Sequence, residues 1–324
     1  MSIKSIKDIP YLKNNKELIE LLLIDKTTNK PIIWASNNYV KKGAEFKKTK
    51  PILVEHIMSK DIIKPRVDKS KSEQIKRSKD NAEVFTPIWI CNLQNNLIDE
   101  AWFKRKDVFN KVNLNKSYTT IKSKIEFPKD KSWVSYIKDN RFEMCCGEAP
   151  YLVSRYDSTT GNGINLEDRI GLLDRKFRII NENSSDDDWI NYSLLALKSI
   201  YGYEFQGDNL YIARSNILLT YIDYYISKFK KEPDIELIKE VINIISWNIW
   251  QMDGLKLVIP YSCHKEEVIQ ISLFDDIKQD GEFCLGCRNN NIKDHNGKRC
   301  YIMDWDKNKK IKYIDLLWGK VNGK

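Results

Sequence analysis

A group of cysteines near the C-terminus has the residue types and the spacing of a zinc site. Cys284 and Cys287 form a Cys-x-x-Cys pair, with Cys263 before it and Cys300 after it. Thiolates are favoured ligands of tetrahedral Zn²⁺, and a closed set of four ligands is typical of a structural site. We expect zinc held by Cys263, Cys284, Cys287 and Cys300, with His295 as the alternative to Cys263. Four reduced thiols without a metal are the other interpretation.

Carboxylates at the ends of expected strands form a second group of interest. Short apolar runs end at 143–149, at Glu204 and at Asp253. Ligands of open parallel sheets bind beyond such strand ends, where a carboxylate can accept hydrogen bonds from a ribose diol and another from an adenine amine. This order predicts a pocket for a nucleoside-containing cofactor. Each residue also has a structural interpretation: Gly147 as a turn glycine, Glu204 as a helix cap, and Asp253 as part of a turn.

These groups must be positioned by alternating strands and helices. Strand patterns occur at 199–203 and 247–252, and helical patterns occur at 189–198, 210–229 and 237–245. A helix start is also expected at Phe85-Thr86-Pro87, because threonine suits a helix cap and proline suits the first turn. The alternation predicts an α/β fold with a mostly parallel sheet covered by helices on both faces.

Composition narrows the class of protein further. The 324 residues are 42% hydrophobic and 31% charged, which is typical of a soluble globular chain. The sequence contains no apolar run long enough to span a membrane, and its N-terminus lacks a signal-peptide core. We therefore expect a cytoplasmic protein without disulfides, and an odd count of seven cysteines agrees with this. The net charge of +9 suits a polyanionic partner such as DNA.

Four segments carry a resemblance to a known family. They are AEVFTP (82–87), EMCCGEA (143–149), GYEFQGDNLYIARSN (202–216) and MDGL (252–255). Together they resemble the S-adenosylmethionine-binding half of DNA adenine amino-methyltransferases of restriction–modification systems. More narrowly, the chain resembles the modification (M) subunits of restriction endonucleases. The similarity covers roughly residues 80–256.

The resemblance implies a Rossmann-like S-adenosylmethionine-dependent methyltransferase sheet with a small C-terminal zinc-binding appendage. Glu204 would hold the ribose hydroxyls, Asp253 would face the adenine, and Glu143 would lie under the methionine moiety. Phe85 and Thr86 would close the pocket. The complete set of implied cofactor contacts is Phe85, Thr86, Glu143, Cys146, Gly147, Glu204, Phe205 and Asp253.

The chain departs from this family at the catalytic step. The family uses an Asn/Asp-Pro-Pro-Tyr/Phe tetrapeptide to bind the adenine amine and to stack on a flipped base. No proline in this sequence is followed by a second proline, so the tetrapeptide is absent. Asp304-Trp305 and the segment 312–320 are the nearest substitutes, and the catalytic residues stay unknown. A partner subunit could supply the catalytic loop or target recognition.

Three functions agree with these patterns. The first is a DNA adenine methyltransferase subunit. The second is an inactive methyltransferase-like binding subunit, or a decoy in conflict between phage and host. The third is a zinc-bearing nucleic-acid-binding protein without a cofactor. The expected domains are an N-terminal mixed α/β region with a basic arm (1–80), an S-adenosylmethionine-binding methyltransferase-like domain (81–258), and a zinc-knuckle-like segment with a hairpin whose turn is 306–310 (259–324).

Overall fold

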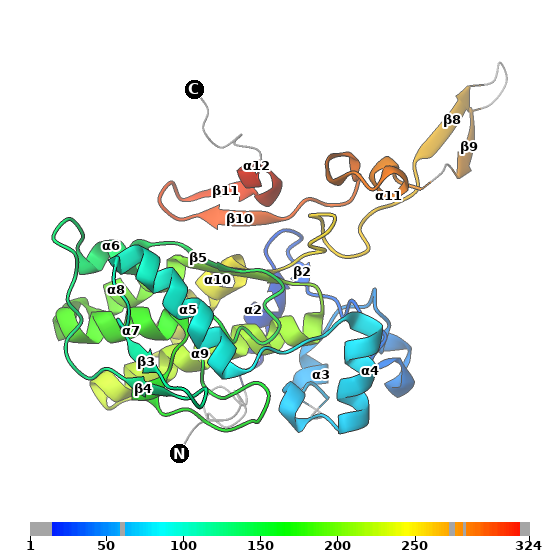
Figure 1. The fold of residues 1–324 in the computed structure, drawn as a ribbon. Coiled ribbons are helices and arrows are strands. Elements are labelled where there is room, and N and C mark those ends of the chain that lie inside the picture. Colours follow the sequence, from blue (N-terminus) through cyan, green and yellow to red (C-terminus); the bar gives the residue numbers. More distant parts are fainter. Residues whose placement is uncertain (1–14, 59–61, 272–275, 281–282, 318–324) are drawn as a thin grey trace.

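The fold is known from a computed structural model, which describes residues 15–58, 62–271, 276–280 and 283–317 (Figure 1). Two terminal segments lie outside this part: residues 1–14 and residues 318–324. The first of them is the segment whose sequence lacks a signal-peptide core. The described residues form a mixed α/β fold with one three-stranded parallel sheet and four antiparallel strand pairs. The expected α/β class is therefore confirmed.

A parallel sheet lies at the centre of the molecule. Its strands are β5 (Arg141–Glu143), β6 (Ile200–Glu204) and β7 (Ile249–Gln251), in the order β5-β6-β7. Parallel neighbours need long crossover connections, and helices supply them here. Because β5 and β6 run in the same direction, their carboxyl ends open at one edge of the sheet.

Four crossover helices cover this sheet. They are α7 (Leu172–Asn183) and α8 (Asp186–Lys198) between β5 and β6, and α9 (Gly207–Phe229) and α10 (Ile235–Asn248) between β6 and β7. Asp234 caps α10 by accepting a hydrogen bond of 2.9 Å from the Leu237 N–H. The six residues of α9 that its spacing turns inward are all buried: Ile212, Ile217, Leu218, Tyr221, Ile222 and Tyr225.

Helix α5 (Ile88–Phe103) begins one residue after Pro87 and buries its polar side. Asn95 and Asp99 are buried, whereas Leu97 is 63% exposed. Asp99 forms an ion pair with the buried Arg175 of α7. Apolar spacing normally marks the core side of a helix, but here buried ion pairing determines which side faces inward.

The N-terminal segment shares the core of the sheet. Its elements are α2 (Lys16–Leu23), β1 (Ile24–Asp25), β2 (Lys30–Pro31), η2 (Val40–Lys42), η3 (Ala44–Phe46), α3 (Val54–Met58), η4 (Arg66–Asp68) and α4 (Lys71–Asn81). Leu18 and Trp34 belong to the same buried cluster as Ile217 of α9 and Ile242 of α10. Residues on both sides of the expected boundary at residue 80 therefore share one core. Helix α4 forms within the expected basic arm.

The remaining elements are β3 (Asn110–Val112), β4 (Tyr118–Thr120), α6 (Trp133–Lys138), η5 (Leu166–Asp168), β8 (Glu267–Ile271), β9 (Asp276–Asp280), α11 (Leu285–Asn289), η6 (Ile292–Asp294), β10 (Tyr301–Asp304), β11 (Lys309–Lys312) and α12 (Tyr313–Leu317).

The C-terminal segment packs on the sheet through a hairpin. The expected hairpin is confirmed as β10–β11, but its turn is 305–308 and not 306–310, because Lys309 and Lys310 already pair with β10. Ile302 and Tyr313 pack with Tyr203 and Trp250 in a second buried cluster. The β8–β9 pair projects from the rest of the molecule (Figure 1).

Candidate functional site

A groove of about 1010 Å³ lies at the edge of the sheet where β5 and β6 end. Its walls come from the loop after β5, the end of β6, the link between α4 and α5, residues 35–37 and Tyr261. A groove of this size is at the upper end of the range for small-molecule and cofactor sites. Seven of the eight expected cofactor contacts line it: Phe85, Thr86, Glu143, Cys146, Gly147, Glu204 and Phe205.

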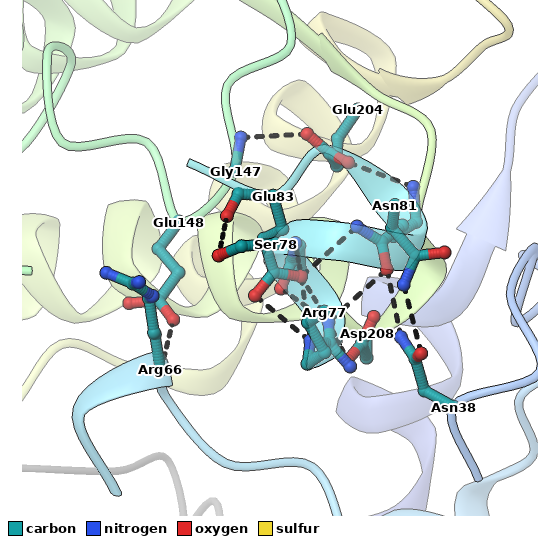
Figure 2. Close-up of polar contacts among 12 residues, drawn as sticks. Asn38, Arg66, Arg77, Ser78, Asn81, Glu83, Gly147, Glu148, Glu204 and Asp208 are labelled. Carbon is teal, nitrogen blue, oxygen red and sulfur yellow. Dashed lines mark hydrogen bonds and ion pairs between the residues drawn. The ribbon is translucent and has the colours of Figure 1, made fainter. Parts of the chain in front are cut away.

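Glu204 is the buried carboxylate at the end of β6. Its side chain accepts hydrogen bonds of 2.9 Å from the N–H of Gly147 and 2.9 Å from the N–H of Gln206, one on each oxygen (Figure 2). The residue is only 6% exposed. Burial raises the pKa of Glu204 to about 7, against the lowering effect of these two N–H groups, and the charges of Asp208 and Glu83 raise it further. Each carboxylate oxygen keeps capacity for another donor.

The loop after β5 holds an unusual backbone conformation. Cys145, Gly147 and Ala149 have φ of 50°, 54° and 63°. Two of these residues carry a Cβ, and such a conformation costs them about 1–3 kcal/mol each. The buried Glu143 supports the loop by accepting hydrogen bonds from the backbone further along, including 3.2 Å from the Leu152 N–H. Strained turns of this kind concentrate at ligand sites.

A buried ionic network fixes helix α4 against the groove. Arg77 forms ion pairs of 2.6 Å with Glu83 and 2.8 Å with Asp208 (Figure 2). Burial raises the pKa of Asp208, but the Arg77 and Lys69 charges, together with hydrogen bonds to the carboxylate, hold that pKa below its usual range. Gln206 extends the network by donating a hydrogen bond of 3.1 Å to Glu83. The expected basic arm, in which α4 lies, is therefore anchored to the groove by the buried Arg77, while the other side of α4 is exposed to solvent.

Asp253 does not belong to the groove. Its Oδ1 atom accepts hydrogen bonds of 3.1 Å from the Leu255 N–H and 3.2 Å from the Lys256 N–H. This corrects the expectation that Asp253 faces an adenine, because the carboxylate caps the turn that follows β7. An aspartate before glycine is well suited to that local role.

Two groove residues escaped the sequence analysis. Ser36 is 5% exposed, and its buried Oγ has no hydrogen-bond partner. Tyr261 donates a hydrogen bond of 3.0 Å to the Ala35 carbonyl and lies edge-on to the ring of Phe205, with 5.9 Å between centroids. Neither residue has a sequence signal, because long-range contacts place both. One such contact joins Gln251 of β7 to the backbone of Ile33.

A second candidate site is a cluster of three cysteines and one histidine. The Sγ atoms of Cys263, Cys284 and Cys287 lie 3.7, 3.7 and 3.6 Å from Nδ1 of His295. All four ligand atoms lie within 4.8 Å of one another. A tetrahedral zinc ion, with bonds of about 2.3 Å to sulfur and about 2.0 Å to nitrogen, separates sulfur from nitrogen by about 3.5 Å. The donor set and its spacing therefore fit a metal ion.

This cluster differs from the expected one at a single ligand. Cys300 is buried in the second hydrophobic cluster, and its Sγ lies 3.5 Å from the Gln251 carbonyl. The expectation that Cys300 is a ligand is thus corrected, and both alternatives for the fourth ligand, Cys263 and His295, take part. Gly286 permits this arrangement, since a Cβ there would lie 2.4 Å from the backbone nitrogen of His295.

The acid–aromatic pair Asp304-Trp305 lies away from the groove. Trp305 donates a hydrogen bond of 2.8 Å from its indole nitrogen to Asn248 at the end of α10. Asp304 accepts a hydrogen bond of 3.2 Å from the Lys307 N–H in the hairpin turn. Both side chains therefore stabilise the hairpin, and neither lines the groove.

Comparisons with protein-family models, with curated proteins and with solved structures found no match to this chain. Among the described residues, no helix has both the length and the apolar character needed to cross a membrane. The function is therefore argued from the geometry of the groove and of the Cys/His cluster.

Proposed function

We propose that the chain binds S-adenosylmethionine in the groove and serves as the cofactor-binding module of a DNA adenine methyltransferase. The observation that carries the proposal is the position of Glu204. Its buried carboxylate stands at the carboxyl end of β6, against the Gly147 turn and inside a groove of cofactor size. Parallel sheets bind nucleoside cofactors at this edge.

The chemistry of the groove suits the parts of this cofactor. Each Glu204 oxygen accepts one backbone N–H, so each can still accept a ribose hydroxyl. Phe205 and Tyr261 offer aromatic surface for the adenine, and the unpaired Ser36 hydroxyl offers a hydrogen bond. The turn through Cys145–Ala149 lines the same groove and contacts Glu204 through the Gly147 N–H, so the methionine part of the cofactor would lie against it.

The methyl-transfer step needs residues that this chain lacks. The Asn/Asp-Pro-Pro-Tyr/Phe tetrapeptide is absent from the sequence, and Asp304-Trp305 lies outside the groove. We infer that a partner subunit supplies the catalytic loop and target recognition. The net charge of +9 favours DNA as the common substrate. An inactive binding subunit or decoy would use the same groove without the partner's loop.

We also infer that the Cys/His cluster holds a structural zinc ion. The ligands Cys263, Cys284, Cys287 and His295 would complete a tetrahedral set around zinc, which would leave no open position for a catalytic water. Metal binding at this cluster would tie residue 263 to the segment 284–295. The zinc is therefore assigned to folding of the C-terminal segment.

Calorimetric titration with S-adenosylmethionine tests the cofactor site. We expect the wild-type chain to bind and Glu204→Ala to bind at least about tenfold more weakly, because two charge-assisted hydrogen bonds are lost. Asp253→Asn is the matched control and should bind like the wild type, since Asp253 caps a turn outside the groove. Circular dichroism checks that each variant is folded. Absence of heat with the wild type, or equal affinity in Glu204→Ala, would overturn the proposal.

A further inference from the structure

A loop rich in lysine borders the proposed cofactor groove. Residues 41–50 contain five lysines and one acidic residue, Glu45. One of these lysines, Lys48, lines the groove, and Lys79 of α4 lines it as well. We call this set of six exposed lysines the lysine rim: Lys41, Lys42, Lys47, Lys48, Lys50 and Lys79.

The positive charges of the lysine rim are not neutralised by neighbouring acids. None of the six side chains forms an ion pair with another described residue. Glu45 lies against Gly43, where an added Cβ would collide with its carboxylate. Asp80 lines the groove and is exposed, whereas the other acids of the groove are buried: Glu83, Glu143, Glu148 and Glu204. Positive charge is therefore in excess at the exposed mouth of the groove.

The core of the protein holds the rim loop in place. Phe46 is 5% exposed, and its ring centroid lies 5.2 Å from that of Trp34. The carbonyls of Lys48 and Lys50 accept hydrogen bonds of 2.8 Å from the Ala35 N–H and 3.0 Å from the Trp34 N–H. Because the backbone under these lysines is already ordered, binding a ligand requires less loss of entropy than it would on a free loop.

Contacts with neighbouring segments extend this surface along the groove. Asn81, the last residue of α4, donates a hydrogen bond of 3.0 Å to Asn38, which precedes the loop (Figure 2). The ammonium group of Lys48 lies 4.7 Å from the ring centroid of Tyr261, which is 45% exposed. Lysines beside an exposed aromatic ring are suited to a nucleic acid, because the lysines attract its phosphates and the ring can stack on a base.

We propose that the lysine rim binds the phosphate backbone of DNA and thereby holds the DNA at the mouth of the groove. Lysine ammonium groups attract phosphates as point charges and do not read the base sequence. This inference rests on the proposed function, because it takes DNA as the substrate. It adds the surface of the chain that contacts the DNA and the residues that form it.

The phosphate backbone can belong to a duplex or to a single strand. Fluorescence anisotropy with a short labelled duplex of mixed sequence, and with one of its strands alone, distinguishes the two forms. Tighter binding of the duplex assigns the lysine rim to duplex DNA. Equal or tighter binding of the single strand assigns the rim to single-stranded DNA.

Two sets of substitutions in the rim test the contacts. The triple variant Lys47→Gln, Lys48→Gln, Lys50→Gln should weaken binding at least about tenfold at about 0.1 M salt. Its affinity should also depend less steeply on salt, because each lost phosphate contact removes roughly one released counterion. The double variant Lys41→Gln, Lys42→Gln should show the same kind of loss from the other end of the loop.

A matched control removes three positive charges elsewhere on the surface. Lys106, Lys111 and Lys124 are exposed, and none of them lines the groove. Lys111 belongs to β3, and Figure 1 shows β3 and β4 on the opposite side of the molecule from α3 and α4. Replacing these three lysines with glutamine should leave the affinity within about twofold of the wild type. Circular dichroism checks that every variant is folded.

Failure of the wild type to bind either form of DNA, or an equal loss of affinity in the rim and control variants, would overturn the proposal. Binding of phosphatidylserine vesicles without binding of DNA would overturn it in favour of a membrane surface. The anisotropy measurement contains no S-adenosylmethionine. It can therefore fail while the calorimetric test of Glu204 succeeds, and the reverse also holds.

Discussion

Glu204, at the end of β6, and Asp208, at the start of α9, are both buried carboxylates, but their electrostatic environments are opposite. Asp208 faces the Arg77 guanidinium at 2.8 Å, so its negative charge is compensated. Glu204 has only backbone N–H groups as partners, and no cation forms an ion pair with it in the described part of the chain. Its pKa of about 7 follows from that difference. An uncompensated carboxylate in a groove is well suited to a ligand that supplies hydrogen-bond donors.

Ligand affinity should depend on the ionisation of Glu204. Ribose hydroxyls donate to the ionised carboxylate, so binding favours the deprotonated form and affinity should rise as pH increases through 7. Glu143, Asp208 and Glu83 are the other acidic groups that face Glu204. With a pKa of about 7, we expect adenosine to bind about tenfold more tightly at about pH 8 than at about pH 6.

Calorimetry with adenosine measures this effect without a titrating amine on the ligand. Glu204→Gln is the control and should show a flat pH profile, because the amide does not ionise in this range. A flat profile in the wild type would contradict the assignment of Glu204 to the ribose diol.

Helices α4 and α5 are positioned by buried ion pairs more than by apolar faces. Arg77 of α4 pairs with Glu83 and Asp208, and Asp99 of α5 pairs with Arg175. The segment between these two helices contains Phe85 and Thr86, so the ion pairs also position one wall of the groove. Buried pairs fix a specific arrangement, and removing one partner leaves a charge in a poorly solvated place.

Arg77→Gln should therefore destabilise the fold strongly. The substitution leaves Glu83 and Asp208 buried without their cation, and the expected loss is about 3–5 kcal/mol in the free energy of unfolding. Urea denaturation followed by circular dichroism measures it. Lys76→Gln removes a charge from the exposed side of the same helix and should stay within about 0.5 kcal/mol of the wild type. A similarly small effect in Arg77→Gln would show that the network does not anchor α4.

The molecule as a whole combines a large core around the sheet with a smaller C-terminal cluster. Cys300, Ile302 and Tyr313 attach the hairpin to Tyr203 and Trp250 through apolar contacts. The Cys/His cluster lies before this attachment in the chain and uses different residues. Packing of the hairpin and metal binding should therefore respond separately to mutation.

Metal analysis of protein purified without chelator tests this separation. We expect about one zinc per chain, because the four possible ligand atoms lie within 4.8 Å of one another and can share one ion. Cys287→Ser changes an exposed ligand and should lose the zinc, whereas Cys300→Ser should retain it, because Cys300 contacts the Gln251 carbonyl instead. Loss of zinc in Cys300→Ser with retention in Cys287→Ser would reverse the assignment of the ligands.

Much of the fold could be predicted because it depends on local patterns. The apolar spacing in 210–229 predicts the buried side of α9, and the short apolar runs before Gly147, at 199–203 and at 247–252 predict β5, β6 and β7. Alternation of strands and helices predicts parallel pairing, which brings the end of β5 next to Glu204. Hydrophobic periodicity acts over neighbouring residues, so it can be read from a single chain.

Long-range contacts decided the remaining features. Spacing predicted Cys300 as a ligand and His295 only as the alternative to Cys263, but the close approach of Gly286 to His295 brings the histidine to the Cys/His cluster. The Asp253 carboxylate accepts a hydrogen bond from its own turn, whereas Ser36 lines the groove from a segment distant in sequence. Local sequence patterns predict the helices, the strands and the residue types of a site. Which of several candidate side chains joins the site depends on the residues that the folded chain brings together. That outcome follows from the cost of burying charged and polar groups without partners.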